Sequence, residues 1–333
     1  MKDDSAAHGA AMTLADGTPC PRALPRRGDA STGGRRSRRP GTLARLALLA
    51  AVLAVAACSS IRLGYNNADT LALYALDSYF DLDDAQESQA RERVRTLLAW
   101  HRRTQLNDYA QFLDTMQRRL DSGVPLTGPE VLALQDDMSA RLMTVARQAA
   151  PEMAVMARTL TPEQLAHFDS KLAKDSAKLR RERVAVAARD ATAATEERIK
   201  RNQERVRRWL GPLTREQEQL VREAVLASPG GERAWLDERE RRQRQLLALL
   251  TRLREEPMTP EAGAALLNRY FAELNTPTDP ARREAVLANR AANADWLARL
   301  LNTATAEQKA RLMKTLRGYA QDFTVLANEG ARS

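Results

Sequence analysis

From about residue 67 onward, apolar residues recur at intervals of three and four and are separated by charged residues, a pattern typical of amphipathic α-helices. No stretch shows the period-two alternation that a half-buried strand needs. The pattern therefore predicts an all-α protein, an elongated bundle of antiparallel helices with at least one very long helix. We expect helices near residues 67–80, 84–121, 128–158, 162–210, 215–227, 232–255, 260–274, 280–303 and 306–328.

One local device marks most of the predicted helix starts. A Thr or Asp is followed three residues later by Gln or Glu, so that each side chain can bond the other residue's backbone amide. The five pairs are Asp83 with Gln86, Thr127 with Glu130, Thr161 with Gln164, Thr214 with Gln217, and Thr305 with Gln308. Gly and Pro clusters between them predict short connections.

The segment 162–210 contains no helix-breaking residue. As one continuous helix of roughly 48 residues it would be ~70 Å long. Its apolar residues form a narrow stripe among many charges, which is equally compatible with a helix that bends or divides into two pieces.

The first 57 residues read as a leader. Arginines between residues 35 and 45 precede the apolar run 46–57, which is shorter than the ~20 residues of a spanning helix. This is the order of a secretory signal peptide. Arg38 and Arg39 suggest a twin-arginine signal, but Pro40 and Gly41 follow where apolar residues are expected, which favours general secretion.

The apolar run ends in Val55-Ala56-Ala57-Cys58. This sequence resembles the lipobox of bacterial lipoproteins, in which the chain is cut before the cysteine. The resemblance implies lipid on the Cys58 thiol and amine, with enough acyl chains to hold a protein stably on a bilayer. Ser59 at the next position implies sorting to the outer membrane.

These features predict four regions. Residues 1–34 are a disordered extension or follow a misassigned start, 35–57 are the signal peptide, 58–66 a lipidated tether, and 67–333 a periplasmic helical body. The only other cysteine, Cys20, lies in the leader, so the mature chain has no partner for a disulfide.

The net charge of the chain limits the classes of partner that we expect. The leader holds nine basic and four acidic residues, a net +5 of the total +9. A mature chain of about +4 presents a mixed-charge surface, so we expect no nucleic-acid partner.

The residue pattern supports no familiar catalytic or metal site. His101 and His167 are the only histidines of the mature chain, and neither has a second ligand at metal-binding spacing. Asp81, Asp83 and Asp84 lack the glycine and the glutamate of a calcium loop, and capping explains them better. We therefore expect no cofactor, no metal and no enzymatic activity, although a site built only from carboxylates stays open as an alternative.

Two basic segments each carry a tryptophan. The candidate partner-binding residues are Arg205, Arg208, Trp209, Trp235, Arg239 and Arg242. They would bind anionic lipid or polymer if they shared one face. Interspersed glutamates favour instead a solvated helix surface with internal ion pairs.

Residues 160–164 read LTPEQ and residues 213–217 read LTREQ, while 304–308 read ATAEQ. These segments resemble the LTxxQ motif of periplasmic helical proteins of the Spy/CpxP kind, which implies a chaperone-like surface. Taken with Tyr65-Asn66-Asn67, Leu82, the run 209–213 and the run 235–250, they also resemble an uncharacterised family of Gram-negative lipoproteins with a domain of unknown function.

Together these observations predict a lipid-anchored protein on the periplasmic side of the outer membrane that binds or scaffolds a protein or peptide partner. An envelope enzyme acting on cell-wall or lipid material, and a binder of anionic lipid or polymer, are the alternatives.

Overall fold

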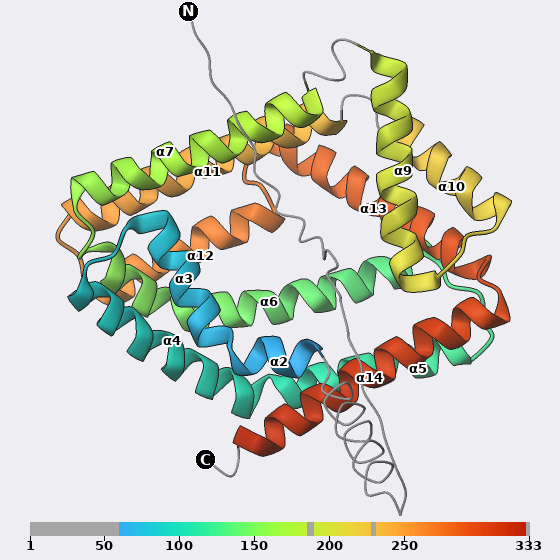
Figure 1. Cartoon of the computed structure of the whole chain (residues 1–333), viewed down its shortest axis with the longest axis horizontal. Coiled ribbons are helices and arrows are strands. Elements are labelled where there is room, and N and C mark those ends of the chain that lie inside the picture. The colour runs from blue at the N-terminus through green and yellow to red at the C-terminus, as the bar shows by residue number, and fades with distance from the viewer. Residues whose placement is uncertain (1–59, 185–189, 228–230, 331–333) are drawn as a thin grey trace, which may run out of the picture. The chain divides into compact units, whose positions relative to one another are not determined.

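The computed structural model describes residues 60–184, 190–227 and 231–330, which belong to one folded unit. These residues form helices joined by short connections and no strand, so the predicted all-α bundle is confirmed (Figure 1). The helices are α2 (Ser60–Asn66), α3 (Ala68–Phe80), α4 (Asp84–Thr104), α5 (Leu106–Asp121), α6 (Gly128–Ala157), α7 (Pro162–Leu179), the π-helical turn η1 (Arg180–Val184), α9 (Ala191–Leu210), α10 (Arg215–Leu226), α11 (Gly231–Glu255), α12 (Pro260–Asn275), α13 (Pro280–Asn302) and α14 (Ala306–Gly330). The predicted leader and Cys58 lie outside the described residues.

The helix starts are fixed by their caps. All five predicted reciprocal caps are present, at the beginnings of α4, α6, α7, α10 and α14. In each, the side-chain oxygen at the N-cap accepts from the backbone amide three residues on, and that residue's side chain accepts from the N-cap amide. Contacts only three residues apart therefore fix where these five helices begin.

The segment 162–210 is not one continuous helix. α7 ends in the wider turn η1, and Asp190 has an extended backbone with its carboxylate accepting from Ala193 N at 2.8 Å. Asp190 therefore begins a new helix, α9. The two-piece alternative describes this segment, and the cap was not foreseen because an alanine stands where the other caps have Gln or Glu.

The predicted helix 84–121 also divides, into α4 and α5 at Gln105. The Thr104 hydroxyl donates to Trp100 O at 2.8 Å, a bond that competes with the helix ladder and favours a bend. The bend directs Leu106 into contact with α14, where it is almost fully buried. No Gly or Pro marks this position, so the sequence pattern missed the break.

Small apolar clusters hold the helices together in pairs. α7 lies beside α11, and α14 beside α5 (Figure 1). The largest cluster joins α6, α7, α11 and α12, a second joins the start of α6 to α13, and a third joins α5 and α14 to α2. α6 contributes to the first two clusters from its opposite ends, so it connects the two halves of the described chain.

The body begins earlier than predicted. Residues 60–66, expected to be part of a tether, form α2, whose Ile61 and Tyr65 pack against the cluster on α14. None of the described helices combines the length and the apolar character needed to cross a bilayer.

The contact between α6 and α12 depends on a glycine. A Cβ on Gly263 would lie 2.7 Å from Ala154 Cβ and 3.1 Å from Leu253 Cδ2. We expect Gly263→Ala to lower the free energy of unfolding in urea by about 1 to 3 kcal/mol, because neither neighbour can withdraw easily. Gly318→Ala is the matched control, since nothing lies within 4 Å of a Cβ there. Gly318→Ala should raise the free energy of unfolding by up to about 1 kcal/mol through helix propensity. Equal changes in the free energy of unfolding at the two positions would contradict the packing argument.

Candidate partner-binding surfaces

A buried pair of capping glutamines joins the starts of two helices. Gln86 at the start of α4 and Gln164 at the start of α7 exchange two hydrogen bonds between their side-chain amides. Gln86 also donates to Thr159 O and Gln164 to Asp81 O, each at 2.8 Å. Because each amide oxygen also accepts from its own N-cap amide, every polar atom of both side chains is bonded.

A second pair repeats this arrangement elsewhere in the bundle. Gln217 at the start of α10 and Gln308 at the start of α14 exchange amide hydrogen bonds of 2.7 and 2.9 Å. Gln217 also donates to Thr303 O, and Gln308 to Pro212 O. The pair thus fixes the loop before each helix to the beginning of the other.

A shallow, mainly apolar depression of about 470 Å³ lies at the second pair. It is lined by Leu210, Pro212, Leu213, Thr214, Thr305, Glu307, Gln308 and Arg311. Gly211 has φ +83°, and a Cβ there would lie 3.4 Å from Arg311 Cδ. The positive φ at the end of α9, between the lining residues Leu210 and Pro212, therefore favours glycine.

Trp209 directly precedes Leu210, a lining residue of this depression, in the chain and is 43% exposed. Its ring meets Tyr319 of α14 edge-on, with centroids 6.2 Å apart. Arg205 and Arg208 on the same helix are exposed. The predicted segment 205–209 therefore ends just before the first lining residue of the depression in the chain. The lining residues themselves were not predicted as candidates, although the LTREQ motif at 213–217 lies in this loop.

The second predicted segment lies on α11 and has different neighbours. Trp235 is 45% exposed, and the guanidinium groups of Arg183 and Arg239 lie 5.3 and 6.0 Å from its ring centre. Arg242 donates to Glu238 at 2.7 Å. The described ring pairs include no contact between the two tryptophans, although the ion pair of Arg201 with Glu232 joins α9 to the start of α11.

Glu238 occupies the centre of a local charge network. Hydrogen bonds from Arg241, supported by those from Arg242, lower the pKa of Glu238 to about 2. Arg201 is similarly bonded to Glu232 at 2.7 Å, and Arg207 to Glu218 at 2.7 Å. Many arginines of these segments are therefore paired with acidic residues of the protein itself.

A second apolar depression, of about 450 Å³, lies along one face of α11. It is lined by Arg244, Leu247, Ala248, Thr251, Arg252, Glu255 and Glu256. These positions recur at three and four residues, so an amphipathic helix could lie along them.

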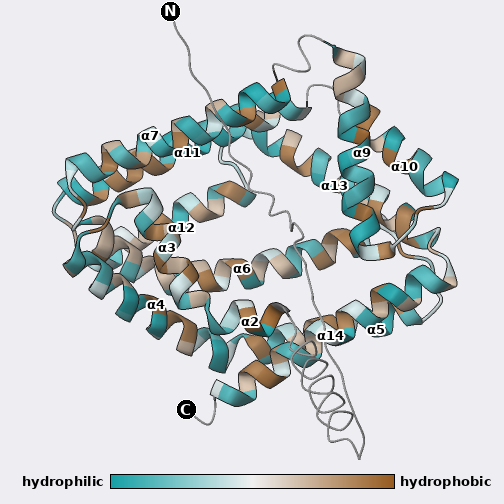
Figure 2. Cartoon of the chain, viewed as in Figure 1, coloured by the Kyte–Doolittle hydropathy of each residue, from teal (hydrophilic) through white to brown (hydrophobic). Residues whose placement is uncertain are grey.

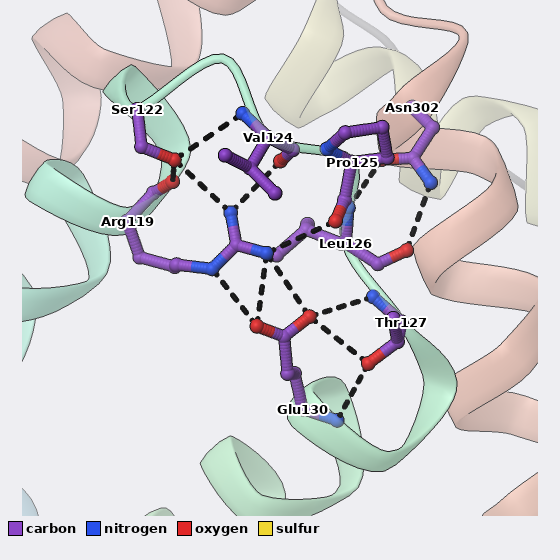
Figure 3. Close-up of polar contacts among 8 residues, drawn as sticks. All are labelled: Arg119, Ser122, Val124, Pro125, Leu126, Thr127, Glu130 and Asn302. Carbon is purple, nitrogen blue, oxygen red and sulfur yellow. Dashed lines mark hydrogen bonds and ion pairs between the residues drawn. The ribbon is translucent and has the colours of Figure 1, made fainter.

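The cap with a glutamate instead of a glutamine has a different partner. Arg119 donates through Nε and Nη2 to the two carboxylate oxygens of Glu130, each at 3.0 Å (Figure 3). The side-chain amide of Asn302 bonds both the N–H and the carbonyl of Leu126 in the same loop (Figure 3). A carboxylate can only accept hydrogen bonds, so Glu130 is paired with an arginine. The capping glutamines can both donate and accept, so they bond one another.

The histidines and the aspartate cluster have structural neighbours. His101 Nδ1 lies 2.9 Å from Tyr65 Oη and its Nε2 3.2 Å from Tyr109 Oη, and burial lowers the pKa of its ring. His167 is exposed, with Nε2 3.5 Å from Ser78 O. Asp83 is an N-cap, as predicted. Within the described ranges, no group of three or more His, Cys, Asp or Glu is arranged to hold a metal ion.

A family model described as a family of unknown function (DUF6279) matches residues 78–274. The chain belongs to this family. The DUF6279 match begins near the end of α3 and ends within α12, so it includes the first glutamine pair, Trp209 and Trp235, but not α14. It fits the predicted domain of unknown function and assigns no activity. Searches of curated proteins and of solved structures found no match.

The glutamine pairs make a prediction specific to the amide in this DUF6279 protein. Gln217→Glu keeps the shape but removes both donated hydrogen bonds and adds a buried charge. We expect a loss of about 2 to 4 kcal/mol in the free energy of unfolding. Gln321→Glu on the exposed side of α14 is the control and should cost less than about 0.5 kcal/mol. Equal losses in urea titrations would show that the pair is not a specific restraint.

Proposed function

We propose that this protein is a membrane-anchored periplasmic lipoprotein whose helical body binds or scaffolds a protein or peptide partner of the cell envelope without catalysing a reaction. Its location rests on the lipobox at Cys58, behind an apolar run and arginines. Outer-membrane sorting rests on Ser59.

The depression between the end of α9 and the start of α14 carries the binding part of the proposal. It is mainly apolar and shallow, the exposed Trp209 directly precedes its lining residue Leu210 in the chain, and the reciprocal amides of Gln217 and Gln308 hold its two sides in place. A preformed apolar surface with an exposed tryptophan and nearby arginines has the composition of a protein-binding site. Preorganisation lowers the entropic cost of binding a peptide there.

A chaperone-like role is one form of this function. The resemblance to LTxxQ proteins supports it, as do large apolar side chains exposed elsewhere on the body. Leu226 is 55% exposed, Leu142 64% and Met138 47%. Met138 and Leu142 lie one turn apart on α6, so they form a small continuous apolar surface of the kind that would contact an unfolded client.

The anchor makes a prediction about mass and location. Wild-type protein expressed in a Gram-negative host should begin at Cys58, carry three acyl chains and sediment with the outer membrane. Cys58→Ala should lack the acyl mass and leave the membrane fraction, because no other thiol remains in the mature chain. Cys20→Ala is the matched control and should behave as wild type, because that cysteine is removed with the leader. An unacylated wild type would overturn the anchored lipoprotein.

The depression makes a separate prediction. A photo-crosslinking amino acid at Trp209 or Leu213 should capture the same envelope protein in living cells, whereas one at Gln219, exposed on the neighbouring helix, should not. A Leu213→Asp substitution should reduce capture from position 209, because it places a charge in the apolar lining. Equal capture from position 219, or capture unaffected by Leu213→Asp, would exclude this depression as the binding site.

A further inference from the structure

The exposed surface of α2 and the first half of α3 is unusually neutral. Its exposed residues between positions 61 and 75 are Leu63, Asn66, Asn67, Thr70, Leu71, Tyr74 and Ala75. None of them is charged, although 29% of the chain is charged, and this neutral stretch ends at the exposed Asp77 of α3. Leu63, Leu71 and Tyr74 are 65%, 57% and 76% exposed.

The colouring of Figure 2 agrees with this difference. α2 mixes apolar residues with the hydrophilic Arg62 and Asn66, whereas α9 is largely hydrophilic (Figure 2). Large apolar side chains beside neutral amides and hydroxyls, with one tyrosine, are the composition of a segment at the boundary between hydrocarbon and headgroups.

This neutral surface begins almost at the proposed anchor. α2 starts at Ser60, two residues after Cys58. Two residues span at most ~7 Å, and Leu63 lies only ~5 Å further along the helix axis. Acyl chains on Cys58 would therefore hold α2 against the bilayer surface.

α2 is also firmly attached to the body. Tyr65 Oη lies 2.9 Å from His101 Nδ1, and Arg102 of α4 donates to Asn66 at 3.0 Å. Arg62 forms an ion pair of 3.1 Å with Asp322 of α14. These contacts use the sides of α2 that face the body and leave Leu63 outward, so the anchor and the body move together.

Cations border the neutral surface on α4. Arg95 pairs with Asp69 of α3 at 3.4 Å but remains 63% exposed at its side chain, and Arg102 donates to Asn66 of α2. Bacterial membranes carry anionic headgroups, to which a partly exposed arginine at the edge of such a surface is attracted.

We infer that the outward surface of α2 and early α3 lies in the membrane interface, with Leu63, Leu71 and Tyr74 in contact with lipid, so that the bilayer orients the whole body. This inference rests on the proposed lipid anchor at Cys58. It adds a second membrane contact, made by side chains rather than by acyl chains.

The test uses the acylated full-length product reconstituted in vesicles of phosphatidylethanolamine and phosphatidylglycerol. A cysteine introduced at Leu63, Leu71 or Tyr74 is the only free thiol after processing and can carry a nitroxide. Leu142→Cys and Val124→Cys are the controls, because these residues are similarly exposed, at 64% and 62%, but lie on α6 and the loop before it. Collision rates with oxygen, which partitions into lipid, and with a water-soluble nickel complex are measured for each.

We expect labels at positions 63, 71 and 74 to gain oxygen collisions and lose nickel collisions severalfold relative to the two controls. Labels as accessible to nickel as the controls, on protein whose mass shows an acylated Cys58, would overturn the membrane surface and leave the lipoprotein proposal intact. Protection from both reagents would also overturn it, because a protein partner or second copy would then cover the surface. A wild type without acyl chains would overturn both proposals.

Discussion

The structure depends on one physical requirement, that the unpaired amides at a buried helix start must find partners. Four of the five reciprocal caps meet it in pairs. Gln86 with Gln164, and Gln217 with Gln308, each bond their own helix start, the other glutamine and the loop before the other helix. Because every donor and acceptor is used, an otherwise costly buried polar group becomes a specific connection between helices.

These connections matter because the apolar clusters are small and separate. Aromatic residues make up only 5% of the chain, and alanines supply much of the buried surface. The close approach of Ala154 to Gly263 permits tight contact between α6 and α12 without large side chains. Specific polar contacts at the helix starts then decide which helices meet, while dispersion and burial hold them together.

Polar pairing also determines the charge distribution on the surface. Many arginines form ion pairs with acidic residues of the same chain, as Arg241 and Arg242 do with Glu238. Mainly apolar surface remains exposed at the depression lined by Leu210, Pro212 and Leu213, and along the outer side of α2 and early α3. The first suits a protein partner and the second a bilayer, and their separation would let a lipid-bound protein present a binding surface to the envelope.

The sequence by itself determined the helical class and five of the helix starts, because these depend on residues only a few positions apart. The reciprocal caps at Thr161 and Thr214 were readable for that reason. The break at Asp190 was not, because its cap lacks the Gln or Glu partner, and neither was the bend at Gln105, which carries no Gly or Pro.

Only the tertiary structure decided which glutamines pair and which tryptophan adjoins a depression. Gln86 and Gln164 are 78 positions apart, and Gln217 and Gln308 are 91 apart. The four glutamines have the same local pattern, so that pattern cannot select their partners. The choice is made where helix packing brings two starts within hydrogen-bonding distance, and the surfaces beside them follow from that choice.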